Sequence, residues 1–299
     1  MSERILDLTR LLPGPLAGQI LQAMGFRVLR LLPPAGDWLQ GYAAETHQWL
    51  QAGKDCETLD LKTEAGRQRL LDLAAESSAL LENSLPGTME RLGVGPELLR
   101  AAHPHLVYVR LSGYRDPAAA ALPGHDLTYL ASAGLLDRLD PAWRSLPLAD
   151  LCGGFWAALA VLNGLRAGGG FYQVSLEAAV ATAAWPPLAG LDGSQCCYAV
   201  YPAADGRVAL AALEPHLWRR FCAAAGRDAW LEAASTPAAP SNPAYLQIAA
   251  MFLERSADAW DAWAAAAGLP LRALRLAPAM PLLPAPWTAR TSGGNLETP

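Results

Sequence analysis

The chain has 299 residues, of which 52% are hydrophobic and 17% are charged, and its formal net charge is −5 at pH 7. This length and apolar content are sufficient for a large core and for two lobes. The negative charge and the absence of a basic tract argue against a nucleic-acid partner.

The N-terminal segment, the apolar runs and the cysteines predict a cytoplasmic protein. Residues 1–15 are charged and are then interrupted by Pro13 and Gly14, unlike a secretory signal. Gly, Pro or Asp interrupts the longest apolar runs, so we expect no membrane span. The five cysteines should be reduced thiols, and the absence of a CxxC pair argues against a zinc site.

In the first half of the chain, the apolar pattern predicts strands that alternate with helices. The expected strands are 5–8, 26–32, 57–61, 80–81 and 106–111, and the expected helices are 16–25, 62–76 and 96–102. We interpret Pro13–Pro15 as a break before the first helix. Val107, Val109 and Leu111 should share one face of their strand. Alternating strands and helices indicate an α/β fold with a parallel sheet and right-handed crossovers.

The second half of the chain predicts a smaller domain. The region after Asp150 is strongly helical, and residues 171–177 form a brief strand-like link. Residues 196–213 indicate a small β unit with a hairpin turn at Asp205-Gly206. We therefore expect a large domain over 1–185, a shortened small domain over 186–275, and a C-terminal tail over 276–299 that returns to the large domain or is poorly ordered.

Two short motifs carry the chemistry that we expect. Gly124-His125-Asp126 and Ala149-Asp150 each precede an apolar run, where a helix should begin. A His and an Asp that face one pocket could form a two-base proton-transfer site, or the Asp could act as a nucleophile. Backbone N–H groups near Asp150 could stabilise an enolate oxygen. The alternative is structural: Asp150 caps its helix and His125 has no chemical role.

With these motifs in order, the chain resembles the family III CoA-transferases, which include formyl-CoA transferase, carnitine CoA-transferase and 2-methylacyl-CoA racemase. The resemblance covers roughly residues 5–226. It is carried by the stretches ILDLTRLLPGPLAGQILQAMGFRVLRLLPP, LDLKTEAGRQRLLDL, LPGTMERLGVGPELL, HPHLVYVRLSGY, GHDLTYLASAGLL, LADLCGGFWAALAVLNGLRA and YPAADGRVALAALEPHLWRRFCAAAG. It implies a Rossmann-like large domain, a smaller α+β domain, and an interlocked dimer that uses a coenzyme A thioester as its substrate and needs no permanently bound cofactor.

The resemblance also assigns roles to three residues. The catalytic acid of the family falls on Asp150, which in transferases attacks the thioester to form a mixed anhydride. The His of the racemase motif falls on His125, and an acid of the racemase type falls on Glu214. These matches favour a 2-methylacyl-CoA racemase. A CoA-transferase that uses Asp150 alone stays open, as does a degenerate subunit without chemistry that partners an active homologue.

Several residues that would bind CoA in this family are changed. Ser112, Gly113 and Tyr114 follow a strand, where α/β ligand sites gather. The Arg-Pro-Gly turn of the family is Leu85-Pro86-Gly87 here, and Lys54 is the one cation left in the family's basic stretch, which here spans 51–55. Loss of cations should weaken binding of the CoA phosphates. One of three arginines, at positions 27, 30 and 110, could replace the lost cations as a partner of the CoA phosphates.

A helical segment near the end of the chain bears on oligomeric state. Trp260, Trp263 and Ala267 recur at helical spacing within DAWDAWAAAAGLPL. An exposed apolar face of this kind would favour a homodimer, or a heteromer with a homologous subunit. The alternative is that this face packs on the core of its own chain.

Overall fold

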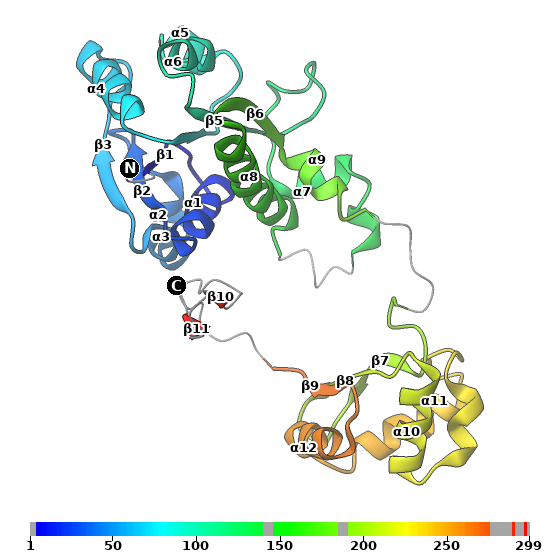
Figure 1. The fold of residues 1–299 in the computed structure, drawn as a ribbon. Coiled ribbons are helices and arrows are strands. Elements are labelled where there is room, and N and C mark those ends of the chain that lie inside the picture. Colours follow the sequence, from blue (N-terminus) through cyan, green and yellow to red (C-terminus); the bar gives the residue numbers. More distant parts are fainter. Residues whose placement is uncertain (1–3, 140–145, 185–190, 276–288, 291–295, 298–299) are drawn as a thin grey trace. The chain divides into compact units, whose positions relative to one another are not determined.

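The computed structural model describes residues 4–139, 146–184, 191–275, 289–290 and 296–297. They form two compact units (Figure 1): unit 1 comprises the described residues of Met1–Ala184 and Ala279–Pro299, and unit 2 comprises those of Trp185–Pro278. The domain boundary that we expected between residues 185 and 186 falls outside the described residues, as does most of the expected tail over 276–299.

Unit 1 is built on a six-stranded sheet with the strand order β3-β2-β1-β4-β5-β6. All neighbouring strands are parallel. The strands are β1 (Arg4–Asp7), β2 (Arg27–Leu32), β3 (Asp55–Thr58), β4 (Ala79–Glu82), β5 (Val107–Ser112) and β6 (Gly170–Ser175). This is the strand order of a Rossmann fold, which confirms the expected fold class. The link predicted over 171–177 is in fact the edge strand β6.

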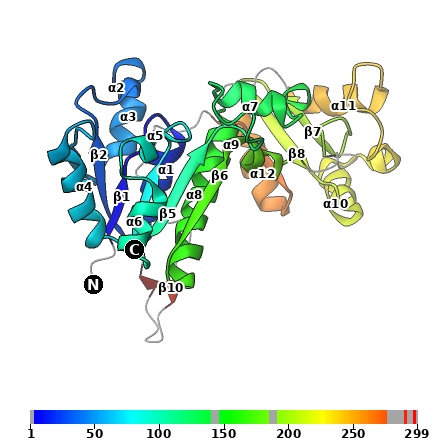
Figure 2. The same cartoon turned by 90° about the horizontal axis from the view of Figure 1, so that it is seen from above.

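Helices cover both faces of this sheet (Figure 2). On one face, α1 (Pro13–Ala23) and α8 (Leu148–Ala167) lie side by side and share a core with Val107 and Val109 of β5. On the other face, α4 (Glu64–Ala75) and α6 (Pro96–Ala102) pack with Tyr108. The alternation predicted for β5 is thus confirmed. The shorter helices of unit 1 are α2 (Trp38–Tyr42), α3 (Ala44–Gln51), α5 (Thr88–Arg91), α7 (Asp126–Ser132), α9 (Leu176–Ala181) and the 3-10 turn η1 (Leu136–Arg138).

The loop between β1 and α1 differs from the sequence prediction. The helix begins at Pro13, so the expected break is its first turn, where a proline lacks an N–H that would be unpaired in any case. Leu11, just before it, has a φ of 67°, a left-handed conformation that is rare for leucine. The backbone N–H of Leu11 donates to the carboxylate of Asp37 at 3.2 Å, which helps to hold this conformation.

Glycines allow the start of α8 to pack closely on its neighbours. A Cβ at Gly154 would lie 2.9 Å from the carbonyl oxygen of Pro13, and one at Gly153 would lie 2.1 Å from the side chain of Leu176. Contrary to our expectation, α8 is long and apolar enough to cross a membrane, alone among the described helices. Its residues Ala157 and Val161 are buried in the core of unit 1, as in the core helix of a globular domain.

Unit 2 combines a small antiparallel sheet with helices. Its elements are β7 (Tyr198–Pro202), β8 (Arg207–Ala211), β9 (Leu271–Ala273), α10 (Pro215–Ala225), α11 (Pro243–Phe252), α12 (Ala257–Ala267) and the 3-10 helix η3 (Asp228–Ala233). The strands β7 and β8 form the predicted hairpin around Asp205-Gly206. The Trp face predicted to be exposed packs inside the unit: Trp260 is 2% exposed, and Trp263 packs against the same core. That face therefore gives no support to a dimer.

Candidate active site

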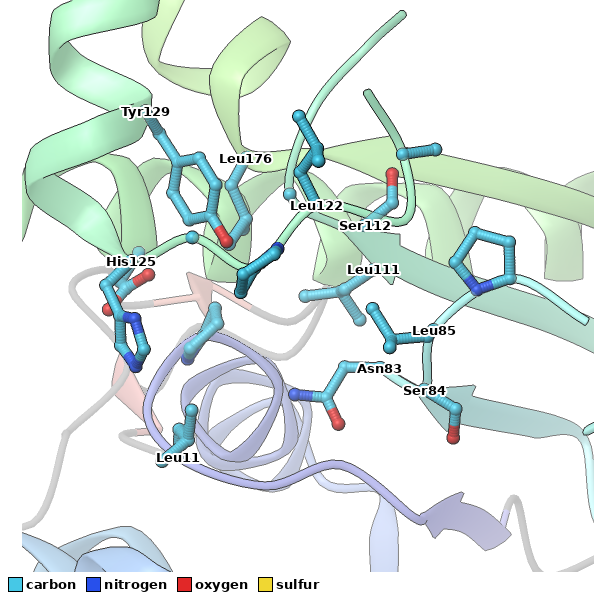
Figure 3. A pocket seen from close by; sticks show the side chains of 17 residues that line it. Leu11, Asn83, Ser84, Leu85, Leu111, Ser112, Leu122, His125, Tyr129 and Leu176 are labelled. Atoms are coloured by element: carbon cyan, nitrogen blue, oxygen red, sulfur yellow. The ribbon is translucent and has the colours of Figure 1, made fainter. Parts of the chain in front are cut away.

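A pocket of about 210 Å³ lies in unit 1 at the carboxyl ends of the central strands. The loop after β1 contributes Leu11 and Pro13, the loop after β4 contributes residues 83–86, and Ser112 ends β5. The order of the sheet reverses between β1 and β4, which is where open α/β sheets bind ligands. Figure 3 shows His125 and Tyr129 on one side of this pocket, and Asn83, Ser84 and Leu85 on the other.

The pocket wall is mainly apolar. The ionisable side chains among its described lining residues are those of His125, Tyr129 and Asp150, and neither Lys nor Arg is among them. The amide of Asn83 is used inside the fold, because it accepts from the backbone N of Arg10 at 3.0 Å and donates to the Arg10 carbonyl at 2.9 Å. The apolar wall is formed by Leu11, Pro13, Leu85, Pro86, Leu111, Ala120, Leu122, Pro123 and Leu176.

Asp150 lies inside the first turn of α8, as its third residue, and not ahead of the helix. A different carboxylate, that of Asp126, caps this helix: its Oδ1 accepts from the backbone N of Ala149 at 2.6 Å and of Asp150 at 3.1 Å. The next donor, Leu151 N, bonds to the Pro147 carbonyl at 2.9 Å. Asp150 therefore does not cap its own helix, and the backbone N–H groups of Asp150 and Leu151 already have partners, which argues against their use in stabilising an enolate.

The surroundings of Asp150 favour its neutral form. Burial, and after it the negative charge of Asp126, together raise the pKa of this carboxyl to about 7. Burial also raises the pKa of Asp126 itself, although two backbone bonds oppose this. The nearby Tyr129 is raised to a pKa of about 12 by burial and by the charge of Asp150, so it stays protonated. Near neutral pH, both forms of the Asp150 carboxyl are present.

His125 is exposed at the edge of the same pocket, as the residue that precedes α7. Its backbone N donates to the hydroxyl of Thr128 at 3.1 Å, and that hydroxyl donates to the carbonyl of His125 at 2.8 Å. These bonds fix the backbone without using the imidazole. The structure therefore brings His125 and Asp150 to one pocket from the starts of two helices.

The remaining predicted site residues are placed differently. Ser112 and Gly113 line the pocket, and a Cβ at Gly113 would lie 2.7 Å from the ring of Tyr129. The hydroxyl of Tyr114 lies 3.1 Å from that of Thr128, and Tyr114 is not a lining residue. Glu214 is exposed in unit 2, where it precedes α10, so its role stays a prediction.

The placement of Lys54 argues against the CoA contact that we expected. Its ammonium lies 2.7 Å from the Pro15 carbonyl and 3.4 Å from Asp7, and its side chain is 0% exposed. Burial lowers the pKa of Lys54 to about 8. A cation so enclosed is not available to a phosphate that approaches from solvent.

Two of the arginines that we considered as substitutes are also engaged inside the fold. Arg30 is fully buried between Asp7, at 3.1 Å, and Asp37, at 2.7 Å. Arg110 pairs with Glu82 and, at 2.9 Å, with Glu90. Arg27 is exposed and lies 3.6 Å from Asp55.

A second pocket, of about 230 Å³, adjoins the first through Ser84, which lines both. Its lining includes two exposed cations, Arg10 after β1 and Lys62 after β3, with Asp60 as the acidic member. Sequence reasoning missed Arg10 and Lys62. Both residues come shortly after strands of the sheet. This position at the carboxyl edge, where α/β folds bind ligands, could have identified them from the sequence.

Comparison of the sequence with known protein families identifies the family of this chain. The model of CoA-transferase family III matches residues 3–281. The chain belongs to this family. The resemblance seen in the sequence motifs is thereby confirmed, and the family is one of acyl-CoA enzymes.

Relatives of this family III protein include both racemases and transferases. It is 30% identical over 277 residues to a probable fatty acyl-CoA transferase of Mycobacterium tuberculosis, covering 77% of this chain and 69% of the relative. It is 32% identical over 241 residues to the human alpha-methylacyl-CoA racemase, covering 72% of this chain but 61% of the racemase. A crystal structure of a hypothetical Mycobacterium tuberculosis protein aligns with a TM-score of 0.77 at 29% identity, over 92% of this chain and 82% of that one.

Proposed function

We propose that the protein is an acyl-CoA racemase that transfers a proton at the α-carbon of a 2-methylacyl-CoA, with Asp150 and His125 as the two bases. One observation carries the proposal: both residues line a single apolar pocket in which the carboxyl of Asp150 has a pKa of about 7. A group that titrates near the working pH is suited to both accepting and donating a proton.

The reaction needs one base on each side of the α-carbon. The thioester makes the α-proton more acidic, because the enolate that forms delocalises its charge onto the carbonyl oxygen. One of the two groups, Asp150 or His125, removes the proton, and the conjugate acid of the other returns a proton to the opposite face. His125 is suited to this role, because an imidazole is a common proton-transfer group in acid–base catalysis. In this scheme Glu214 stays a supporting acid, as the family resemblance implies.

The pocket favours an apolar acyl group. Leucine and proline side chains form most of its wall, and no cation among the described lining residues could pair with a second carboxylate on the substrate. Its volume of about 210 Å³ is below the roughly 300–1,000 Å³ of pockets that enclose a whole drug-sized ligand. We therefore place the acyl thioester end of the substrate here, and the CoA phosphates at Arg10 and Lys62 in the adjoining pocket.

A CoA-transferase is the second candidate. In that reaction the carboxylate of Asp150 attacks the thioester carbonyl, the thiolate of CoA leaves, and an aspartyl mixed anhydride forms. The relative described as a probable fatty acyl-CoA transferase favours this alternative. A non-catalytic subunit is the third candidate, favoured by the loss of the family's cation at Leu85.

Incubation of the protein with assorted acyl-CoAs in deuterated water, followed by mass spectrometry, separates the three candidates. Racemisation introduces deuterium at the α-carbon of a 2-methylacyl-CoA. A transferase gives an acyl adduct or exchanged CoA when a free carboxylic acid is supplied. If neither product forms with any of the acyl-CoAs, both enzymatic candidates are wrong.

Binding of CoA should depend on Lys62 and Arg10. We expect Lys62→Gln and Arg10→Gln each to raise the Kd for free CoA by roughly tenfold, because each removes a charge-assisted phosphate contact. Arg27→Gln, at an exposed cation that lines neither pocket, is the control. Titration calorimetry measures all three. An unchanged Kd in both pocket variants would place the phosphates elsewhere.

We propose that the protein is a dimer, now on different grounds from the Trp face of α12. On α8, Phe155 is 53% exposed, Trp156 is 44% exposed and Leu159 is 50% exposed, so the described part of unit 1 leaves a row of apolar side chains open. Such a row favours association. We expect sedimentation at micromolar concentration to show a dimer, and Leu159→Glu to shift it toward monomer. A single monomeric species in the parent protein would contradict the proposal.

A further inference from the structure

The start of α8 is capped by a residue from another helix. The first backbone N–H groups of a helix have no partner within it, and Pro147, which precedes α8, provides no side-chain cap. Asp126, at the first position of α7, supplies that cap with its Oδ1, at 2.6 Å from Ala149 N and 3.1 Å from Asp150 N. The two short motifs of the sequence are thus joined by one carboxylate.

The bonds from Asp126 to the start of α8 connect the two proposed bases, His125 and Asp150. Asp126 directly follows His125 in the chain, and its carboxylate bonds to the backbone N of Asp150. A shift of α7 against α8 would therefore change the position of His125 relative to Asp150. The cap also occupies two backbone donors that could otherwise bond to the carboxyl of Asp150 and stabilise its charged form.

We infer that Asp126 is a positioning residue of this site, which caps α8, holds His125 and Asp150 at the same pocket and places its negative charge beside the Asp150 carboxyl. The inference rests on the proposed function of Asp150 and His125 as proton-transfer groups.

The charged surroundings of Asp150 are consistent with this role. The carboxylate of Asp126 is the charged group that raises the pKa of Asp150, in addition to burial. Glu177 is engaged elsewhere, because it accepts from Ser132 and from the backbone N of Arg115. Among the helices that pack most closely on α8, α7 carries Tyr129 and is preceded by His125, α9 carries Glu177, and α1 carries no titratable group, while Cys152 lies on α8 itself.

Two substitutions separate the cap from the charge. Asp126→Asn keeps a carbonyl oxygen that can cap α8 but removes the charge, whereas Asp126→Ala removes both. Asp205 gives a control in unit 2, where its Oδ1 accepts from Ala257 N at 2.7 Å at the start of α12, a helix that the side chain of Ser256 also caps. Asp205→Asn and Asp205→Ala thus measure what the loss of one carboxylate bond at a helix start does to stability away from the pocket.

The readouts are the pH profile of α-proton exchange, thermal melting, and the titration of the Asp150 carboxyl followed by ¹³C NMR. For Asp126→Asn we expect the acid limb of the kcat/KM profile and the Asp150 midpoint both to move to lower pH by at least half a unit, because a neighbouring negative charge is gone. For Asp126→Ala we expect kcat also to fall by 10- to 100-fold, with a loss of Tm similar to that in Asp205→Ala.

The outcomes distinguish this inference from the proposed function. If the Asp150 midpoint stays where it is in Asp126→Asn, and Asp126→Ala loses no more activity than Asp205→Ala, the inference is wrong. If the midpoint moves but the parent protein exchanges no α-proton, the inference about Asp126 holds and the racemase proposal is wrong.

Discussion

Asp150→Asn is expected to remove measurable turnover, with a loss of at least a thousandfold in deuterium incorporation, while the protein stays folded. The amide can neither accept nor release a proton, and it is not a nucleophile. The substitution should therefore abolish activity whether the protein is a racemase or a CoA-transferase. Asn is close to Asp in size, and the cap of α8 comes from Asp126, so the helix should be undisturbed. Mass spectrometry of the α-carbon measures the effect.

Stability as a function of pH provides the folding control for this variant. The pKa of Asp150 rises from 3.8 to about 7 on folding, so the native state binds more protons than the unfolded state between these values. The carboxyl therefore stabilises the fold fully below about pH 4 and loses that contribution as the pH rises through about 7. We expect Asp150→Asn to melt at or above the parent's temperature at alkaline pH, and the difference to shrink toward pH 4. Full activity in this variant would contradict every enzymatic role given to Asp150.

His125→Ala should reduce racemisation by about 10²–10⁴-fold, because one of the two proton-transfer groups is lost. The fold should tolerate the change, since His125 is exposed and Thr128 holds its backbone. A transferase would lose far less, because its nucleophile is Asp150. Deuterium incorporation and CoA exchange, measured on the same variant, therefore separate the two candidates.

His105 offers a matched control for this experiment. It is exposed and precedes β5, whereas the pocket lies beyond the other end of that strand. His105→Ala should leave racemisation unchanged. If His125→Ala costs less than tenfold in racemisation, the two-base assignment is wrong, even if Asp150→Asn is inactive.

The sequence by itself determined the fold class of unit 1, the family and the two motifs of the pocket. Alternation at Val107 and Val109 predicts a strand because side chains on a strand point to opposite faces. The hairpin at Asp205-Gly206 follows from local turn chemistry. The apolar pattern placed His125 and Asp150 at the starts of two helices, and the resemblance to the family assigned their roles.

Only the tertiary structure decided which partner each charged side chain of the site has. Lys54 appeared to be the surviving CoA ligand, but it lies against Asp7, which is 47 residues away in the chain. The cap of α8 comes from Asp126, 24 residues before Asp150, and not from Asp150 itself. Trp260 packs into the core of its own unit, although its helical spacing would equally fit an interface. Periodicity shows which face of an element is apolar, but burial and pairing depend on segments that are distant in sequence, so they follow only once those segments are packed.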